Sequence, residues 1–339
     1  MKRVVALGEL LLRLRAPTGE RLLQSARLEA SYGGAEFNVL ASLVRFNVTT
    51  DYVSALPQGG LGPTALALIR QHGVGARYIE YAAGRLGLYF LEAGNGVRPA
   101  RVVYDRAGTV FADIDARRFD WSAILSGADL LHLSGITPAV SESAAQLAHA
   151  AAEAAAALKV PVSFDLNMRS QLWQASGRDP FASLVPLLRR AAVVFATCDD
   201  AAFCLPQPRR AACRSGDFAP FAAALFAEYP ALEVLIASTR RGSSAADFEL
   251  GAEAQRRGGP VLRGKEFAVR GALEVVGGGD ALVAGCLYGM LVGWPDQRWL
   301  DFGLAARALK HTIGGDINLA ALDEIEALLA GATPVRTLR

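Results

Sequence analysis

Short apolar runs alternate with longer helical patterns along most of the chain. The short runs are rich in β-branched residues, which is typical of buried strands. We predict strands at residues 4–8, 51–55, 130–133, 160–165, 192–195 and 232–237. The longer stretches, several of them rich in alanine, predict helices at 35–44, 64–71, 143–158, 280–292, 300–313 and 322–329. This alternation predicts an α/β fold in which helices cover both faces of a mostly parallel sheet.

Two segments, at about residues 10–32 and 85–106, interrupt this alternation of predicted strands and helices. Both contain short runs in which apolar and polar residues alternate, as in residues 87–92. A small antiparallel sheet made from the two inserts would explain the pattern, and it would form a lid that excludes water from a site at the edge of the main sheet. A pair of ordinary surface hairpins would explain it equally well. No linker is evident, so we predict a single domain over residues 1–339.

Composition narrows the choice of partners. The chain has 35 Lys and Arg against 33 Asp and Glu, a net charge of +2, which gives no electrostatic basis for binding nucleic acid or a membrane surface. No apolar run approaches the roughly 20 residues of a membrane span. The four cysteines are scattered and form no CxxC pair, which favours reduced thiols over a disulfide framework or a zinc site. We therefore predict a cytoplasmic protein.

Three glycines, Gly277, Gly278 and Gly279, lead directly into an apolar helix that starts with Asp280. Backbone N–H groups at a helix N-terminus attract anions, so this loop could cradle a phosphoryl group. Asp280 would then lie where a carboxylate could take a proton from an attacking hydroxyl. An ordinary N-cap aspartate behind a flexible loop would give the same pattern.

Two further polar motifs follow predicted strands or precede a helix. Gly33 and Gly34 come before a helix that carries Asn38 about one turn from its start, which indicates either close approach to a polar ligand or a turn that needs positive φ. Asn167 and Arg169 follow Asp165 at the carboxyl end of a predicted strand, where open α/β sheets bind ligands. A salt-bridged surface loop is the alternative for this second motif.

These three motifs occur in the order used by ribokinase-like carbohydrate kinases of the phosphofructokinase B type, and the chain resembles that family. Further segments narrow the resemblance to 2-keto-3-deoxygluconate kinases and extend it over nearly the whole chain. They are Gly8-Glu9, Arg13-Leu14, residues 85–92, 103–107 and 134–138, Trp173 and residues 310–318. The resemblance implies a three-layer α/β/α sandwich with a small β-sheet lid.

The resemblance also implies roles for individual residues. Asp280 would be the base and the amides of Gly277, Gly278 and Gly279 the anion hole. The sugar acid would contact Gly33, Gly34, Asn38, Tyr89, Tyr104, Arg106, Asn167 and Arg169. ATP would bind near Thr197, Ser238, Arg240 and Gly314, with Mg²⁺ near Asp200. The expected reaction is ATP-dependent phosphorylation of 2-keto-3-deoxygluconate at its 6-hydroxyl. Separately, an exposed edge of the lid sheet would form a dimer contact, so we predict a homo-oligomer that assembles through the lid.

Some positions depart from the family pattern, chiefly on the nucleotide side. Thr197 and Asp200 stand where Asn and Glu are usual, Glu274 stands where an aspartate is usual, and Gly314 replaces a proline. Two alternatives therefore remain open: a kinase for another sugar such as fructose or ribose, and a sugar-acid-binding homologue with weakened nucleotide use.

Overall fold

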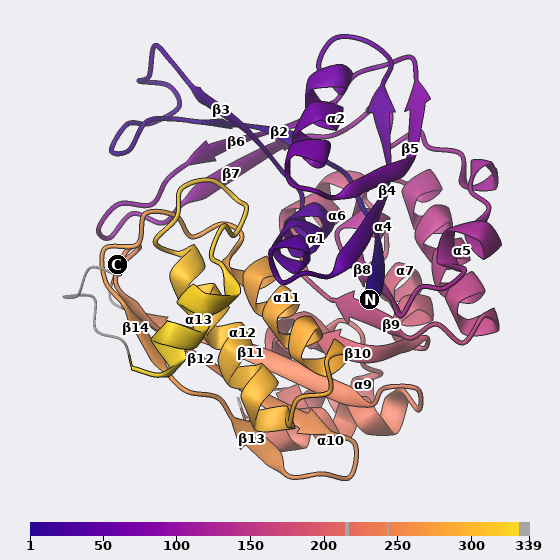
Figure 1. Ribbon diagram of the computed structural model, residues 1–339, viewed down its shortest axis with the longest axis vertical. Helices are drawn as coiled ribbons and strands as arrows, with labels where there is room; N and C mark the ends of the chain where they lie inside the picture. The colour runs from indigo at the N-terminus through magenta and orange to yellow at the C-terminus, as the bar shows by residue number, and fades with distance from the viewer. Residues whose placement is uncertain (214–216, 243, 332–339) are drawn as a thin grey trace.

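A long, mostly parallel sheet runs through the middle of the computed structural model (Figure 1), which describes residues 1–213, 217–242 and 244–331. Within these residues the strand order is β13-β12-β11-β10-β9-β8-β1-β4-β5, and β14 pairs with β12. The strands are β1 (Arg3–Leu7), β4 (Thr49–Pro57), β5 (Gly75–Ala82), β8 (Leu130–Ser134), β9 (Val162–Asp165), β10 (Ala191–Phe195), β11 (Val234–Gly242), β12 (Phe248–Arg256), β13 (Val261–Arg263) and β14 (Phe267–Val269).

Helices cover both faces of this sheet. In β1 the alternate residues Val4 and Ala6 join one core, and Val5 and Leu7 join the other, because successive side chains of a strand point to opposite faces. The first face carries α1 (Ala35–Arg45), α2 (Gly62–Gln71), α11 (Gly278–Leu291), α12 (Asp296–Lys310) and α13 (Leu322–Leu329). The second carries α3 (Trp121–Leu125), α4 (Thr137–Val140), α5 (Glu142–Ala157), α6 (Ser170–Ser176), α7 (Pro180–Leu188), α8 (Cys198–Ala202) and α10 (Phe218–Glu228).

The predicted three-layer α/β/α architecture is thus confirmed. The described residues also contain the short helix α9 (Gln207–Arg210) and 3₁₀ turns at Ala116–Arg118 and Ala211–Cys213. In the portion of the chain that the structure describes, no helix combines the length and the apolar character needed to cross a membrane.

A second, four-stranded sheet extends from the main body at the upper left of Figure 1, and we call it the lid sheet. Its strands are β2 (Leu11–Arg15), β3 (Glu29–Gly33), β6 (Gly87–Glu92) and β7 (Arg101–Asp105), in the order β3-β2-β6-β7. They come from the two segments that break the α/β rhythm, so the predicted small sheet is confirmed.

The expectation that this small sheet is purely antiparallel was wrong at its centre. β2 pairs with β3 and β6 with β7 in antiparallel fashion, but β2 and β6 are parallel. The reason is topological: β1 and β5 are parallel strands of the main sheet, and β2 and β6 follow them from the same edge in the same direction.

The edges of the main sheet were not anticipated from the sequence. β5 forms one edge, and at the other edge β12 runs antiparallel to β11, with β13 and β14 beyond it. The alternation of β12 between glycine, alanine and charged residues weakens the apolar signal by which the inner strands are found.

Candidate active site

A cavity of about 450 Å³ lies at the carboxyl edge of the main sheet, between this edge and the lid sheet. That volume lies within the range of small-molecule binding sites. All but two of the predicted site residues line it: Gly33, Gly34, Asn38, Tyr89, Tyr104, Arg106, Asn167, Arg169, Thr197, Asp200, Ser238, Arg240, Gly277, Gly279 and Asp280. The two exceptions, Gly278 and Gly314, are not part of the cavity wall.

The fold explains why residues so distant in sequence meet here. The parallel strands β9, β10 and β11 all end or pass at this edge, and they deliver Asp165, Thr197 and Ser238. The helices α1 and α11 begin at the same edge, so their N-termini, with Gly34 and Gly277, face the cavity. This is the edge at which open α/β sheets bind ligands.

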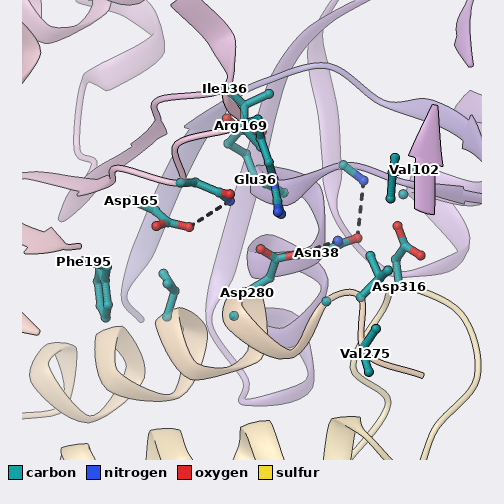
Figure 2. A pocket seen from close by; sticks show the side chains of 18 of the residues that line it. Glu36, Asn38, Val102, Ile136, Asp165, Arg169, Phe195, Val275, Asp280 and Asp316 are labelled. Atoms are coloured by element: carbon teal, nitrogen blue, oxygen red, sulfur yellow. Dashed lines mark hydrogen bonds between the residues drawn. The ribbon is translucent and has the colours of Figure 1, made fainter. Parts of the chain in front are cut away.

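Asp280 lies in the first turn of α11 and is buried, with 8% of its surface exposed. Asn38 donates from Nδ2 to Asp280 Oδ2 at 2.7 Å, and Figure 2 shows this pair with Asp165 and Asp316 on either side. Burial raises the pKa of Asp280 to about 7, opposed by the Asn38 hydrogen bond and by Arg169, and supported by the charge of Asp316. A carboxylate with a pKa near neutral is suited to accept a proton from a hydroxyl group.

The glycine loop before Asp280 has a conformation that side chains would disrupt. Gly277 has φ of +82°, and a Cβ there would lie 1.8 Å from the carbonyl oxygen of Asp316. Because the first N–H groups of a helix have no partner within it, the amides of residues 278–280 are free to bind an anion. A Cβ on Gly278 would lie 2.5 Å from Cε1 of the His311 ring, so this residue could serve the site only through its amide.

Gly33 and Gly34 are required for close packing and not for positive φ. Gly34 has an extended backbone with φ of −176°, and a Cβ on it would lie 2.3 Å from the carbonyl oxygen of Glu9. A Cβ on Gly33 would lie 2.1 Å from Asp316 Oδ2. The alternative of a strand-to-helix turn with positive φ was therefore wrong, and the backbone at this point closes directly on two carboxylate-bearing segments.

The two predicted carboxylate-binding arginines lie in different settings. Arg106 is buried, and its Nε donates to Glu9 Oε2 at 2.7 Å, which orients the guanidinium. Arg169 is exposed at the N-terminus of α6 and forms no ion pair with the described residues, so the alternative of a salt-bridged surface loop finds no support there. Both guanidinium groups line the cavity, where they can bind a carboxylate in a bidentate manner.

Tyr89 and Tyr104 face each other across the lid strands β6 and β7, with ring centroids 6.2 Å apart. The hydroxyl of Tyr89 donates to Asp316 Oδ2, and burial raises the pKa of that hydroxyl well above its ordinary value. The two tyrosines therefore contribute an uncharged, largely apolar part of the cavity wall, in which the Tyr89 hydroxyl is held in one orientation by Asp316.

Acidic side chains form another part of the wall. Burial and the charge of Asp280 raise the pKa of Asp165 to about 8, and Asn167 Nδ2 donates to Asp165 Oδ2 at 3.2 Å. Burial also raises the pKa of Glu36, whose Oε1 accepts from Ser134 Oγ at 2.5 Å. Several carboxyl groups with raised pKa values in one cavity are a feature of functional sites.

The residues predicted to bind the nucleotide are part of local structure. Thr197 Oγ1 accepts from the amide of Asp200 at 3.2 Å and caps α8, which leaves the carboxyl of Asp200 on the cavity wall with its pKa raised by burial. Ser238 and Arg240 lie on β11, and the Arg240 guanidinium stacks 3.8 Å above the centre of the Phe248 ring. Gly314 lies in the loop after α12, and its assignment to the nucleotide stays a prediction.

Several polar residues of the site were not among the predicted site residues. Glu9, Glu36, Asp165 and Asp316 line the cavity, and Arg13 and Glu274 lie behind its wall. All except Glu274 belong to the motifs that carry the resemblance, which was the available signal; Glu274 stands out only as a departure from the family pattern. What the sequence could not supply is that these charges meet one another across the fold.

Known proteins resemble the chain over nearly its whole length. Residues 1–321 match the pfkB family carbohydrate kinases. The 2-dehydro-3-deoxygalactonokinase of Haloferax volcanii is 32% identical over 332 residues, covering 97% of this chain and 96% of that protein. The 2-dehydro-3-deoxygluconokinase of Thermoproteus tenax is 28% identical over 339 residues, covering 97% and 94%.

A solved structure agrees with these sequence matches. The crystal structure of 2-dehydro-3-deoxygluconokinase from Thermotoga maritima superposes with a TM-score of 0.88 at 31% identity, and covers 98% of this chain and all of that chain. The cavity at the carboxyl edge, the small sheet beside it and the full-length match all indicate the same family. The chain is a sugar kinase and belongs to the pfkB family of carbohydrate kinases.

Proposed function

We propose that the chain transfers the terminal phosphoryl group of ATP to the 6-hydroxyl of 2-keto-3-deoxygluconate, also called 2-dehydro-3-deoxygluconate. The observation that carries the proposal is the placement of Asp280, the free amides of the glycine loop, Arg106 and Arg169 around one cavity. The names of the relatives in Haloferax volcanii and Thermoproteus tenax support a six-carbon 2-keto-3-deoxy acid as the acceptor.

On the acceptor side, the carboxylate of the sugar acid would bind Arg106 and Arg169, and this anchors one end of the molecule. Tyr89, Tyr104, Asn38 and the backbone at Gly33 and Gly34 would contact the hydroxyls between the two ends. The 6-hydroxyl would then face Asp280, which takes its proton as the new P–O bond forms. Charge that develops on the phosphoryl oxygens would be stabilised by the amides of residues 278–280.

On the donor side, Thr197, Ser238, Arg240 and Gly314 are the residues we assign to ATP. Mg²⁺ is usually bound by one or two carboxylates together with substrate phosphates and water, so a full protein ligand set is not required. Asp200 fits this role because its carboxyl lies on the cavity wall beside the donor residues. When bound, the metal would neutralise charge on the phosphates.

An ADP-release assay over a panel of acceptors tests the proposal. The panel holds 2-keto-3-deoxygluconate, its C4 epimer 2-keto-3-deoxygalactonate, fructose and ribose. We expect turnover on the acids and a kcat/KM at least about 100-fold lower on the neutral sugars, because only the acids pair with both arginines. Turnover on neutral sugars alone would establish the other-sugar kinase, and binding of the acid without ADP release would establish the binding homologue.

We also propose that the chain forms a homo-oligomer through the lid sheet. Its outer strands β3 and β7 each leave one edge unpaired within the described residues, and Val103 on β7 is 39% exposed. The molar mass of the protein in solution, measured by light scattering, tests this, and a monomer at micromolar concentration would contradict it. A cytoplasmic location stays a prediction.

A further inference from the structure

A buried ion-pair network lies behind the cavity and joins the lid sheet to the glycine loop. Its centre is Arg13, which lies on the lid strand β2 and has only 1% of its surface exposed. The guanidinium donates from Nη1 to Asp316 Oδ1 and from Nη2 to Glu274 Oε2. Both carboxylates are buried, at 4% and 3% exposure, so cations of the protein balance them in place of water. Arg13 pairs with both directly, and the buried ammonium of Lys310, which donates to the carbonyl of Ile313, also attracts both carboxylates.

Glu274 connects this arginine to the glycine loop. Its second oxygen, Oε1, accepts from the amides of Val275 and Val276 at 3.0 and 3.2 Å. These two residues lead directly into Gly277, and both line the cavity. The orientation of the Glu274 carboxylate therefore sets the path by which the chain enters the loop.

Asp316 connects the same arginine to the other side of the loop and to the sugar-facing lid. Its Oδ2 accepts from the Tyr89 hydroxyl, and its backbone carbonyl packs against Gly277. Tyr89 is the residue that pairs with Arg13 in the register of β6 and β2. Two neighbouring lid strands thus hold one carboxylate between them, next to the first glycine of the loop.

The network gives a physical reason for Glu274 at a position where the family usually has aspartate. One oxygen of its carboxylate must hold two loop amides while the other reaches the lid arginine. In this structure the added methylene of glutamate, relative to aspartate, spans the distance between the two loop amides and the lid arginine. The longer side chain is therefore part of the connection between loop and lid.

We propose that Arg13 is a positioning residue for phosphoryl transfer, which ties the lid sheet to both segments that set the glycine loop. It does not contact the reacting atoms and acts through Glu274 and Asp316. This inference rests on the proposed kinase function, and it assigns to a lid residue the alignment of the anion-binding amides with Asp280. Misplacement of a catalytic loop by about 1 Å can lower a rate about 100-fold.

The test compares Arg13→Met and Arg13→Lys with a matched control, Arg3→Met. Arg3 is also a largely buried arginine on an N-terminal strand, with Nε 2.8 Å from Asp51 Oδ2. It lies at the amino end of β1, on the side of the sheet opposite to the cavity at the carboxyl ends of the strands. Hydrogen–deuterium exchange of a peptide that covers residues 274–280 reports on the loop without any substrate. Steady-state kinetics give kcat and the KM for each substrate.

For Arg13→Met we expect exchange of the Val275 and Val276 amides to become at least tenfold faster and kcat to fall about 100-fold. Each KM should stay within about threefold, and Arg13→Lys should recover part of kcat because an ammonium can pair with one of the two carboxylates. Arg3→Met should lower the melting temperature but leave exchange of this peptide and kcat unchanged.

Arg13→Met with exchange and kcat within twofold of the unmodified protein would overturn the proposal, and so would an equal loss in Arg3→Met. Should Arg13→Met fail to fold, Glu274→Gln takes its place, since the amide keeps an acceptor for Val275 and Val276 and ends the ion pair. Unchanged exchange and kcat in that variant would also overturn the proposal. If the unmodified protein shows no sugar-acid turnover, the proposed acceptor is wrong, while the exchange measurement still decides whether Arg13 positions the glycine loop.

Discussion

At the scale of single residues, the site contains carboxyl groups whose pKa values lie close to neutral pH. Asp280 and Asp165 have pKa values raised to about 7 and about 8, chiefly by burial. The hydrogen bond from Asn38 and the charge of Arg169 oppose the rise of the Asp280 pKa and keep it near neutral pH. At a pKa near 7, a general base is partly ionised at neutral pH and still binds a proton well enough to accept one from a hydroxyl group.

The pH dependence of turnover follows from this pKa. Because Asp280 acts in its ionised form, kcat/KM should rise about tenfold per pH unit below pH 7 and level off above it. Asp280→Asn should lower kcat about 10²–10⁴-fold at pH 8 and abolish this rise. An unchanged pH profile in the Asn variant would assign the titration to another group.

The arginines at the cavity should discriminate acids from neutral sugars. Arg169→Ala should raise the KM for 2-keto-3-deoxygluconate at least tenfold and change the KM for a neutral sugar by less than about threefold, because only the acid loses an ionic contact. Arg101→Ala is the control, since Arg101 is an exposed lid arginine outside the cavity wall. Equal effects of Arg169→Ala on both acceptors would contradict carboxylate recognition.

Residue types at the site could be found from the sequence, but their pairings could not. Asp280, Asn38 and Arg169 follow from motifs that lie next to predicted strand and helix ends. Arg13 and Glu274 are 261 residues apart in sequence and meet only because β2 crosses behind the glycine loop. No local pattern encodes such a contact, so its charge balance became visible only in the structure.

At the scale of elements, α11 carries both the proposed base, Asp280, and the amides that we propose to bind the phosphoryl group. Positive-φ glycines flank it at both ends, Gly277 with φ of +82° and Gly293 with φ of +77°. Only Gly277 also packs against backbone, since nothing lies within 4 Å of a Cβ on Gly293. Gly293 therefore serves as a control for Gly277: a side chain at either position strains the backbone, but only at Gly277 does it also collide with neighbouring residues.

Alanine at these two positions should separate the effects. Gly293→Ala should cost about 1–2 kcal/mol of unfolding free energy, the strain of a left-handed alanine, and leave kcat unchanged. Gly277→Ala should destabilise the fold further and lower kcat at least about 100-fold, because the carbonyl of Asp316 must move and carry the loop with it. Thermal melts and steady-state kinetics measure both, and a fully active Gly277→Ala would show that the loop geometry is not needed.

Inner strands and long helices were predictable because burial imposes a periodic pattern on them. The inner strands from β1 to β11 and the helices α1, α5 and α11 agree with their predicted ranges within a few residues. β5, at one edge of the sheet, and β12, next to the other edge, carry mixed sequences with a weak apolar pattern, and they were missed. The parallel pairing of β2 with β6 was missed because strand direction depends on topology, which spacing does not show.

At the scale of the whole molecule, near-neutral charge coexists with strongly charged local sites. The net charge of +2 excludes broad electrostatic attraction, and the site instead uses a few buried arginines and carboxylates. Such groups cost stability, since a carboxyl whose folded pKa is raised prefers to be neutral in the folded protein. The site is therefore expected to weaken the fold at alkaline pH.

Asp165 offers a direct measure of this cost. Its folded pKa of about 8 exceeds its ordinary value, so its contribution is favourable at low pH and is lost as pH rises toward 8. Asp165→Asn should therefore raise the melting temperature relative to the unmodified protein at pH 8.5, with a smaller gain at pH 5. Asp296→Asn is the control with opposite sign, because the hydrogen bond from Arg256 lowers the pKa of Asp296. A gain from Asp165→Asn that does not depend on pH would refute the titration of Asp165.

The most direct test of the central claim is phosphorus NMR of the product formed from ATP and 2-keto-3-deoxygluconate. We expect a phosphate monoester on the primary carbon C6, formed by the unmodified protein at a steady rate and by Asp280→Asn only in traces. No ester with the unmodified protein, or an ester formed equally fast by Asp280→Asn, would contradict a sugar-acid kinase in which Asp280 is the base.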